Sequence, residues 1–225
     1  MSGMIETYAN NAALAEAAAA AVAAQLRLAL RTHGRAGLVG TGGRSPAPVY
    51  DRLTTCDVDW SRVIVTLSDE RCVPADAPES NARLVREHLL TGEGAKAHFV
   101  PLWPKPDPAA LTALMPFDAV LLGMGEDGHI ASLIPGDPAL PRHLDPGGEA
   151  LLVDVPAGLG SPPVARVSLT LKALLAARAI FLLIAGGAKR EVVERAMAGE
   201  DLPVRALLAP GPVPVRVLWT PRFER

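Results

Sequence analysis

Cysteine is scarce in this 225-residue chain, which contains only Cys56 and Cys72. Two cysteines are too few for a disulfide framework. They form neither a CxxC pair nor part of a Cys/His cluster, so the sequence indicates no structural zinc. This usage is typical of a protein of the reducing cytoplasm.

A concentration of positive charge is also lacking. The formal net charge is −2, and the 22 basic residues are scattered along the chain rather than massed in one segment. Such a distribution gives no electrostatic footprint for nucleic acid, and a small anionic ligand fits better than a polymer. Lysines are few, and only Lys189 follows a predicted strand beside glycines.

The chain has no long run of strongly apolar residues. Residues 12–24 are rich in alanine, but Glu6 and Glu16 precede or interrupt the segment, and no basic region opens the chain as in an export signal. A membrane-spanning helix needs about 20 strongly apolar residues. We therefore expect residues 12–31 to form an ordinary helix that does not insert into a membrane.

Several familiar motifs are missing as well. No Gly-x-Ser-x-Gly nucleophile elbow occurs, and Cys72 has no obvious base beside it. The glycine-rich segment 40–45 has serine where a dinucleotide fingerprint needs a third glycine or alanine, and it lacks the Gly-Lys-Ser/Thr ending of a P-loop. These absences argue against NAD and ATP and favour direct attack by water.

Strands and helices alternate along the chain. Hydrophobic side chains make up 49% of the residues, enough for one substantial core. The pattern, which has no internal repeat, predicts an α/β fold with a three-layer, doubly wound, mostly parallel, Rossmann-like sheet in a single domain over residues 1–225. Proline-rich segments 101–108 and 135–146 are expected loops that either border a ligand crevice or only connect elements. The expected strands are 37–40, 63–67, 119–122, 180–185 and 215–219, and the expected helical segments are 12–31, 46–53, 81–90, 167–175 and 189–197.

The segment 117–136 carries the strongest signal of a site. An apolar strand runs into Gly123 and Gly125, which permit a sharp turn, and then into Asp127 and His129. Ligands of open α/β sheets collect outside the carboxyl ends of the strands. A lone histidine is often only a hydrogen-bonded loop residue, but this placement favours a functional pair in which a neutral His129 takes a proton from water. No third metal ligand accompanies the pair, so we expect no catalytic metal.

Other strand ends supply groups for an anion. The loop 41–45 leads into a predicted helix whose free N–H groups favour a phosphate, although the loop alone fits a simple turn equally well. Arg71 and Lys189 either add cations to this site or form surface ion pairs. Asp69 and Glu70 are possible acids or bases, but we expect them to hold the neighbouring guanidinium in place.

Five motifs occur in order along nearly the whole chain: TGGRSP (41–46), SDERCVP (68–74) with Ser80-Asn81, GMGEDGHIASLIPG (123–136), RVSLT (166–170) and GGAK (186–189). Together they resemble the 6-phosphogluconolactonase family, within the larger glucosamine-6-phosphate isomerase-like group.

The resemblance implies hydrolysis of 6-phospho-D-glucono-1,5-lactone to 6-phosphogluconate in the oxidative pentose phosphate pathway, without a cofactor. His129 would be the general base that activates water, and Asp127 would help to place it. The implied partner is the small phosphosugar lactone, with no nucleic acid or membrane, and the sequence gives no signal of a protein partner. The implied substrate-binding residues are Gly42, Gly43, Arg44, Ser45, Asp69, Arg71, Arg166 and Lys189.

Three positions depart from the family pattern: Arg44 stands where serine is common, Ile134 stands where phenylalanine is usual, and segment 156–166 lacks the usual lysine before its prolines. The rival glucosamine-6-phosphate deaminase shares the Gly-x-Asp-Gly-His core but continues Ala-Phe-Asn-Glu-Pro-Gly. Ile134 replaces that glutamate and cannot transfer a proton, which favours the lactonase. A non-catalytic sugar-phosphate sensor is a third alternative, but it would need an output domain, and no helix-turn-helix extension is left over.

Overall fold

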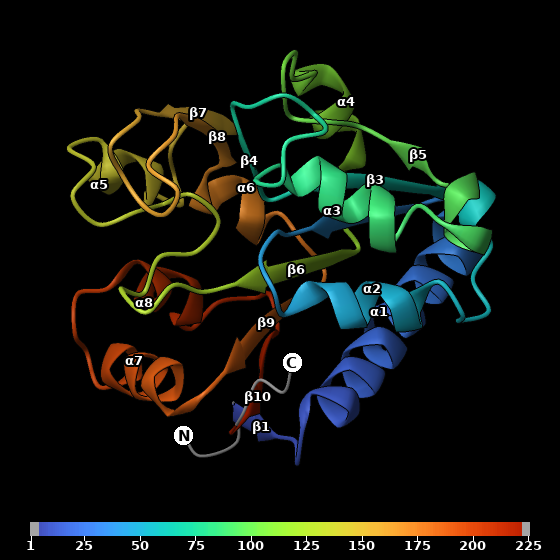
Figure 1. Cartoon of the computed structure of the whole chain (residues 1–225), viewed down its shortest axis with the longest axis horizontal. Coiled ribbons are helices and arrows are strands. Elements are labelled where there is room, and N and C mark those ends of the chain that lie inside the picture. The colour runs from blue at the N-terminus through green and yellow to red at the C-terminus, as the bar shows by residue number, and fades with distance from the viewer. Residues whose placement is uncertain (1–4, 222–225) are drawn as a thin grey trace.

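A parallel sheet of seven strands crosses the part of the chain that the computed structural model describes, residues 5–221 (Figure 1). Its strands are β1 (Ile5–Thr7), β2 (Ala36–Gly40), β3 (Val63–Leu67), β5 (His98–Phe99), β6 (Ala119–Gly123), β9 (Ile180–Ala185) and β10 (Val215–Thr220). Their order in the sheet is β1-β10-β9-β6-β2-β3-β5, and every neighbouring pair is parallel. Because parallel strands need crossover connections, helices cover both faces of such a sheet.

The helices lie on the two sides of this sheet, as the predicted three-layer, doubly wound fold requires. Figure 1 shows α1, α2 and α3 on one side of β6, β9 and β10, and α7 and α8 on the other. The helices are α1 (Asn11–His33), α2 (Pro46–Leu53), α3 (Asn81–His88), α4 (Pro108–Leu114), α5 (Leu140–His143), α6 (Leu171–Leu175), α7 (Gly187–Met197) and α8 (Pro203–Leu208), with short 3-10 helices η1 (Trp60–Arg62) and η2 (Gly92–Lys96).

A second, antiparallel sheet contains β4 (Asp69–Arg71), β8 (Arg166–Leu169) and β7 (Leu152–Val155), in the order β4-β8-β7. The prediction of a helical segment over 167–175 is therefore wrong in its first half. Thr170 caps the helix that follows, accepting a hydrogen bond from the Ala173 N–H at 3.2 Å, so α6 begins only at Leu171. The residues before the cap pair with β7 and with β4, and β4 lies about 95 residues earlier in the sequence.

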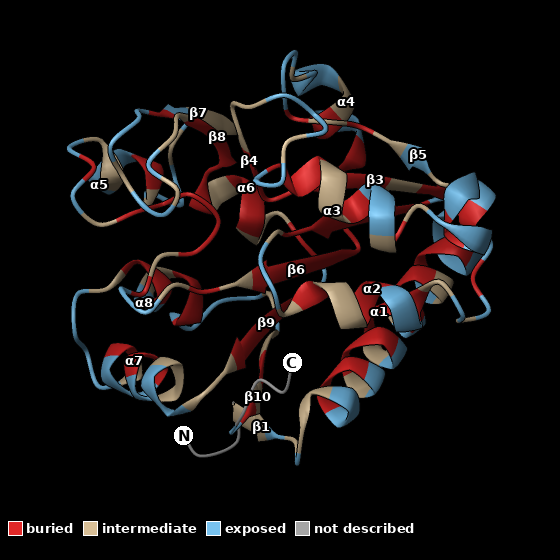
Figure 2. Ribbon diagram, in the orientation of Figure 1, coloured by how far each residue is buried: buried red, intermediate tan, exposed pale blue. Residues whose placement is uncertain are grey.

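Helix α1 packs against the sheet and against α2. Its inward face is formed by small and aliphatic side chains, including Leu14, Ala18, Val22 and Leu26, all buried. By length and composition alone α1 could cross a membrane, yet half of its most apolar window is buried within the protein, as for a core helix of this fold. Figure 2 shows the same pattern, with buried residues on the sheet and exposed residues on the outer faces of the helices.

Candidate active site

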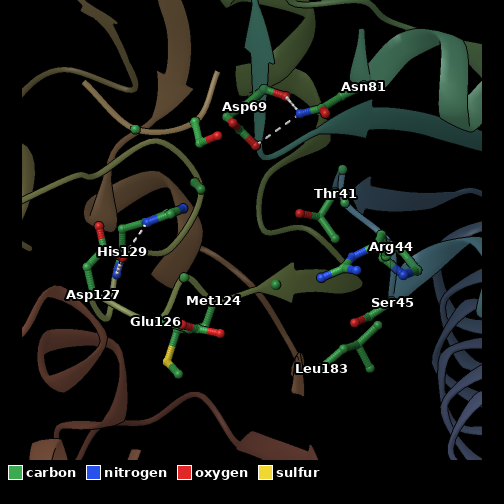
Figure 3. A pocket seen from close by; sticks show the side chains of 18 of the residues that line it. Thr41, Arg44, Ser45, Asp69, Asn81, Met124, Glu126, Asp127, His129 and Leu183 are labelled. Carbon is green, nitrogen blue, oxygen red and sulfur yellow. Dashed lines mark hydrogen bonds and ion pairs between the residues drawn. The ribbon is translucent and has the colours of Figure 1, made fainter. Parts of the chain in front are cut away.

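A cavity of about 800 Å³ opens at the carboxyl ends of the parallel strands. All ten residues predicted for the site line it, although they come from five separate segments of the chain. Figure 3 shows Asp127 and His129 on one side of this cavity and Arg44 and Ser45 on the opposite side. The predicted reacting pair, Asp127 and His129, therefore faces the predicted anion-binding loop 41–45 (the anion loop) across a space wide enough for a small ligand.

The turn after β6 brings Asp127 and His129 into contact. The Nδ1 atom of His129 lies 2.6 Å from Asp127 Oδ1, and the same oxygen accepts the His129 backbone N–H at 3.2 Å. A carboxylate can only accept, so Nδ1 carries the proton and Nε2 of the neutral ring is free to accept one. Burial raises the pKa of Asp127, but the hydrogen bond and charge of His129 lower it more, so that it lies below its usual value. Asp127 is thus ionised and can stabilise the imidazolium that forms when His129 accepts a proton.

This contact depends on glycine at position 125. A Cβ atom added to Gly125 would overlap His129 Nδ1 and Asp127 Oδ1, so no larger residue fits beside the pair. The backbone closes the same turn, because Gly125 N–H donates to the His129 carbonyl at 3.0 Å and Gly128, at φ +80°, donates to the Gly125 carbonyl at 3.1 Å. The predicted sharp turn is confirmed.

The loop between β2 and α2 is held by two residues that the site prediction missed. The fully buried Tyr50 hydroxyl accepts from the Thr41 N–H at 2.7 Å and donates to the Thr41 carbonyl at 2.8 Å. Asn81 packs so closely on Gly42 that a Cβ there would overlap its side-chain oxygen, and Gly43 has φ +96°. At Gly42 and Gly43 the loop therefore presents bare backbone to the cavity, as backbone binding of an anion requires. The sequence does not mark Tyr50 as a site residue, because its hydroxyl bonds only to the backbone of Thr41.

Arg71 and Arg166 face one another across the antiparallel β4–β8 pair. Arg166 is only 2% exposed, and within the described part of the chain the buried Nε atoms of both side chains have no hydrogen-bond partner. Burial and the charge of Arg71 lower the pKa of Arg166, whereas Asp69 raises it. Two neighbouring guanidiniums with unused donors are what an anionic group would satisfy.

Lys189 lies half-buried in the first turns of α7 and lines the same cavity. Burial lowers the pKa of Lys189, Glu126 opposes this shift, and the charge of Arg44 adds to it. The anion loop and the start of α7 thus place two cations in electrostatic contact at the cavity wall. Arg44 thus adds to the positive potential that Lys189, Arg71 and Arg166 supply in the cavity.

The expectation that Asp69 and Glu70 hold the Arg71 guanidinium is wrong. The buried Glu70 carboxylate instead accepts the Arg71, Asn81 and Ala82 N–H groups at 2.7 to 2.8 Å and the Ser80 hydroxyl at 3.2 Å, and so anchors the start of α3. Successive strand residues point to opposite faces, so Glu70 turns away from the cavity that Asp69 lines. The Arg71 guanidinium donates to the Glu79 carbonyl.

The proline-rich segments 101–108 and 135–146 do not line the cavity. Its remaining wall includes Gly160 and Ser161, from the segment whose departure from the family pattern was noted above. Within residues 5–221 no group of three or more His, Cys, Asp or Glu side chains could hold a metal ion. The site offers one histidine–carboxylate pair and a set of cations around a polar cavity.

Comparison with known proteins gives consistent matches over almost the whole chain. A family model described as "Glucosamine-6-phosphate isomerases/6-phosphogluconolactonase" matches residues 9–219. The chain is 42% identical to a 6-phosphogluconolactonase of Caulobacter vibrioides, with 96% of each chain covered. It is 38% identical to the enzyme of that name from Rhizobium meliloti, covering 98% of this chain and all of the other.

A solved structure matches equally well. The crystal structure of a 6-phosphogluconolactonase from Shewanella baltica superposes with a TM-score of 0.87 at 35% identity, covering 96% of this chain and 97% of the other. The match includes the mostly parallel central sheet and its flanking helices, so the predicted fold class is confirmed.

Proposed function

Because the chain belongs to the glucosamine-6-phosphate isomerase/6-phosphogluconolactonase family, we propose that it hydrolyses 6-phospho-D-glucono-1,5-lactone to 6-phosphogluconate. It is an enzyme of the lactone-hydrolysing branch, since relatives at 38 to 42% identity are named 6-phosphogluconolactonase. The observation that carries the proposal is the cavity itself, where a histidine–carboxylate pair faces a loop and cations suited to phosphate.

The reaction needs a base at one end of the substrate. In our proposal Nε2 of His129 removes a proton from water as the water oxygen attacks the lactone carbonyl carbon. The resulting imidazolium is stabilised by Asp127, 2.6 Å from Nδ1. The tetrahedral oxyanion then collapses, the ring C–O bond breaks, and the leaving ring oxygen takes the proton back from His129. Nearby N–H groups and cations of the cavity stabilise the oxyanion.

The other end of the substrate is a dianionic phosphate. We assign it to the backbone of Gly42 and Gly43, to Ser45, and to the cations around them. Arg71 and Lys189 line the same cavity, as do Arg44 and Arg166. Arginine offers a fork of donors to phosphate oxygens and lysine a point charge, so the set suits a phosphomonoester better than a neutral sugar.

The rival deamination reaction lacks one of its groups here. The residue before Pro135 is Ile134, which is 2% exposed and carries no proton to transfer. The matching position in the deaminase pattern is glutamate. In our proposal lactone hydrolysis needs no acid at this position, because Asp127 and His129 supply the base.

We place the reaction in the oxidative pentose phosphate pathway and in the cytoplasm. The pathway follows from the proposed substrate. The cytoplasmic location is supported by Cys56 and Cys72, which are both free thiols. We propose the phosphosugar lactone as the ligand and neither nucleic acid nor a membrane.

The test is a comparison of substrates with the purified protein. Proton release from 6-phosphogluconolactone is followed against the spontaneous background, and ammonia release from glucosamine 6-phosphate is measured in parallel. We expect acceleration of the first and none of the second. Ammonia release without lactone hydrolysis would make the protein a deaminase, and no turnover of either would favour a sugar-phosphate sensor.

A further inference from the structure

Three residues after His129 comes Ser132, which has no solvent exposure and does not line the cavity. Its hydroxyl donates to Asp69 Oδ2 at 2.6 Å, and its backbone N–H donates to the Ser168 hydroxyl at 3.1 Å. Its hydroxyl oxygen also accepts a long hydrogen bond, 3.4 Å, from Arg166. Ser132 thereby ties the segment after His129 to both β4 and β8.

The residue between this anchor and the histidine has an unusual backbone. Ala131, at φ +48°, is the only residue other than glycine with a positive φ among residues 5–221. This left-handed conformation is unfavourable for alanine and persists only where its surroundings hold it. The Gly125–His129 backbone bond holds the turn on the histidine side, and the Leu133 N–H closes it around Ala131 by donating to the Ile130 carbonyl at 2.9 Å. Ser132 lies inside this second turn and adds the hydrogen bonds that tie it to β4 and β8.

We propose that Ser132 is a positioning residue: its bonds to Asp69 and Ser168 keep Ala131 in the left-handed conformation and so fix the turn that presents His129. This inference rests on the proposed role of His129 in lactone hydrolysis. Ser132 acts only through its neighbours, because it has no surface in the cavity.

Loss of the Ser132 hydroxyl should leave the anion loop in place. Asp69 keeps two other donors, the Ser68 hydroxyl at 3.1 Å and the Asn81 side chain at 3.3 Å. Asn81 also donates to the Asp69 backbone carbonyl at 2.9 Å and remains packed on Gly42. Arg166 loses one long hydrogen bond but keeps its bond to the Pro162 carbonyl at 2.8 Å. We therefore expect the substitution to lower the rate of the reaction and to leave phosphate binding nearly unchanged.

The first experiment compares Ser132→Ala with Thr66→Val. Thr66 is a matched control, because its buried hydroxyl also makes a hydrogen bond, at 2.9 Å to the Val100 carbonyl, but holds no part of the cavity. We expect Ser132→Ala to lower kcat about 10- to 100-fold, since a small misplacement of a reacting group has this effect. The dissociation constant of 6-phosphogluconate should stay within about threefold, and Thr66→Val should lose thermal stability without a comparable loss of kcat. A parallel loss of kcat and product affinity in Ser132→Ala would overturn the proposal.

The second experiment asks whether Ala131 carries the effect. Glycine adopts a positive φ without strain, so Ala131→Gly removes the need for an anchor. The kcat ratio for Ser132→Ala should therefore shrink to about threefold or less when both proteins also carry Ala131→Gly. An equal loss in the two backgrounds would refute positioning through Ala131.

A readout independent of turnover separates this inference from the proposed function. The imidazole NMR signals of His129, assigned with His129→Gln, should shift or broaden in Ser132→Ala and stay unchanged in Thr66→Val. If the wild type fails to hydrolyse the lactone, the proposed function falls, and these signals still decide whether Ser132 places the ring. Unchanged signals in Ser132→Ala would contradict the inference even in an active enzyme.

Discussion

Gly125 offers a sharp test of the reacting pair, because a side chain at this position would collide with both members while the backbone bonds of the turn could remain. A methyl group at this position would lie well inside 3.0 Å of both His129 Nδ1 and Asp127 Oδ1, a separation that real Cβ atoms essentially never show. The ring and the carboxylate must therefore move by on the order of 1 Å. A misplacement of about 1 Å costs about 10²-fold in rate, or about 2.7 kcal/mol of barrier. We expect Gly125→Ala to lower kcat by about this factor.

The assay is the initial rate of lactone hydrolysis over the spontaneous background, combined with calorimetric binding of 6-phosphogluconate. The matched control is Gly211→Ala, because Gly211 is exposed and a Cβ there would meet only the Ala209 carbonyl, at 3.8 Å. The control should retain full kcat, and both variants should keep product affinity within about threefold, since Gly125 lies away from the anion loop. If Gly125→Ala keeps more than half of the wild-type kcat, the close contact of Asp127 and His129 is not needed for the reaction.

Three further predictions follow from the other contacts of the site. Asp127→Asn should lower kcat about 10²- to 10⁴-fold, because the imidazolium formed during the reaction loses the carboxylate that stabilises it; a kcat within about threefold of wild type would contradict this pairing. Lys189→Gln should weaken 6-phosphogluconate binding about tenfold or more at neutral pH. Because burial lowers the pKa of Lys189, wild-type affinity should decline as rising pH removes its charge, and calorimetry should find this decline absent from the variant. Glu70→Ala should lower the free energy of unfolding by about 3 kcal/mol, since it strips the start of α3 of its acceptor, and a melting temperature within about 2 °C of wild type would refute that role.

Much of the main sheet could be predicted because its signals are local. The strand at 63–67 and the helix at 46–53 occur at the predicted bounds, and the helix predicted at 12–31 is slightly longer than predicted and runs from Asn11 to His33. Runs of apolar residues, a proline at the first helical position and a glycine after the last turn all act within a few residues. The single-domain organisation over residues 1–225 stays a prediction.

The second sheet could not be predicted in the same way. β4 and β7 have only three and four residues, and one of the two partners of β8, the strand β4, lies about 95 residues earlier, as in the register of Arg71 with Arg166. The residue pattern within one segment does not indicate which distant strand that segment pairs with. The first half of 167–175 was therefore taken for a helix, although the Thr170 cap marks the true boundary.

In the candidate site, too, local signals could be predicted and contacts between distant segments could not. Residues that follow strand ends, such as His129 and Lys189, could be predicted to meet, because parallel strands bring their carboxyl ends to one edge. Tyr50 and Ser132 were missed, because each acts through hydrogen bonds to groups that only the folded chain brings close. The role of Glu70 was misassigned because alternation along β4 turns it toward α3.

The central claim is that His129 activates water for attack on the lactone. The most direct measurement compares the enzymatic rate of 6-phosphogluconolactone hydrolysis by wild type and His129→Gln, with product affinity measured on both proteins. Our account predicts that His129→Gln loses most of the acceleration, by at least about 10²-fold, while binding 6-phosphogluconate nearly as tightly as wild type. Near-normal turnover by His129→Gln would contradict the account and assign the base elsewhere.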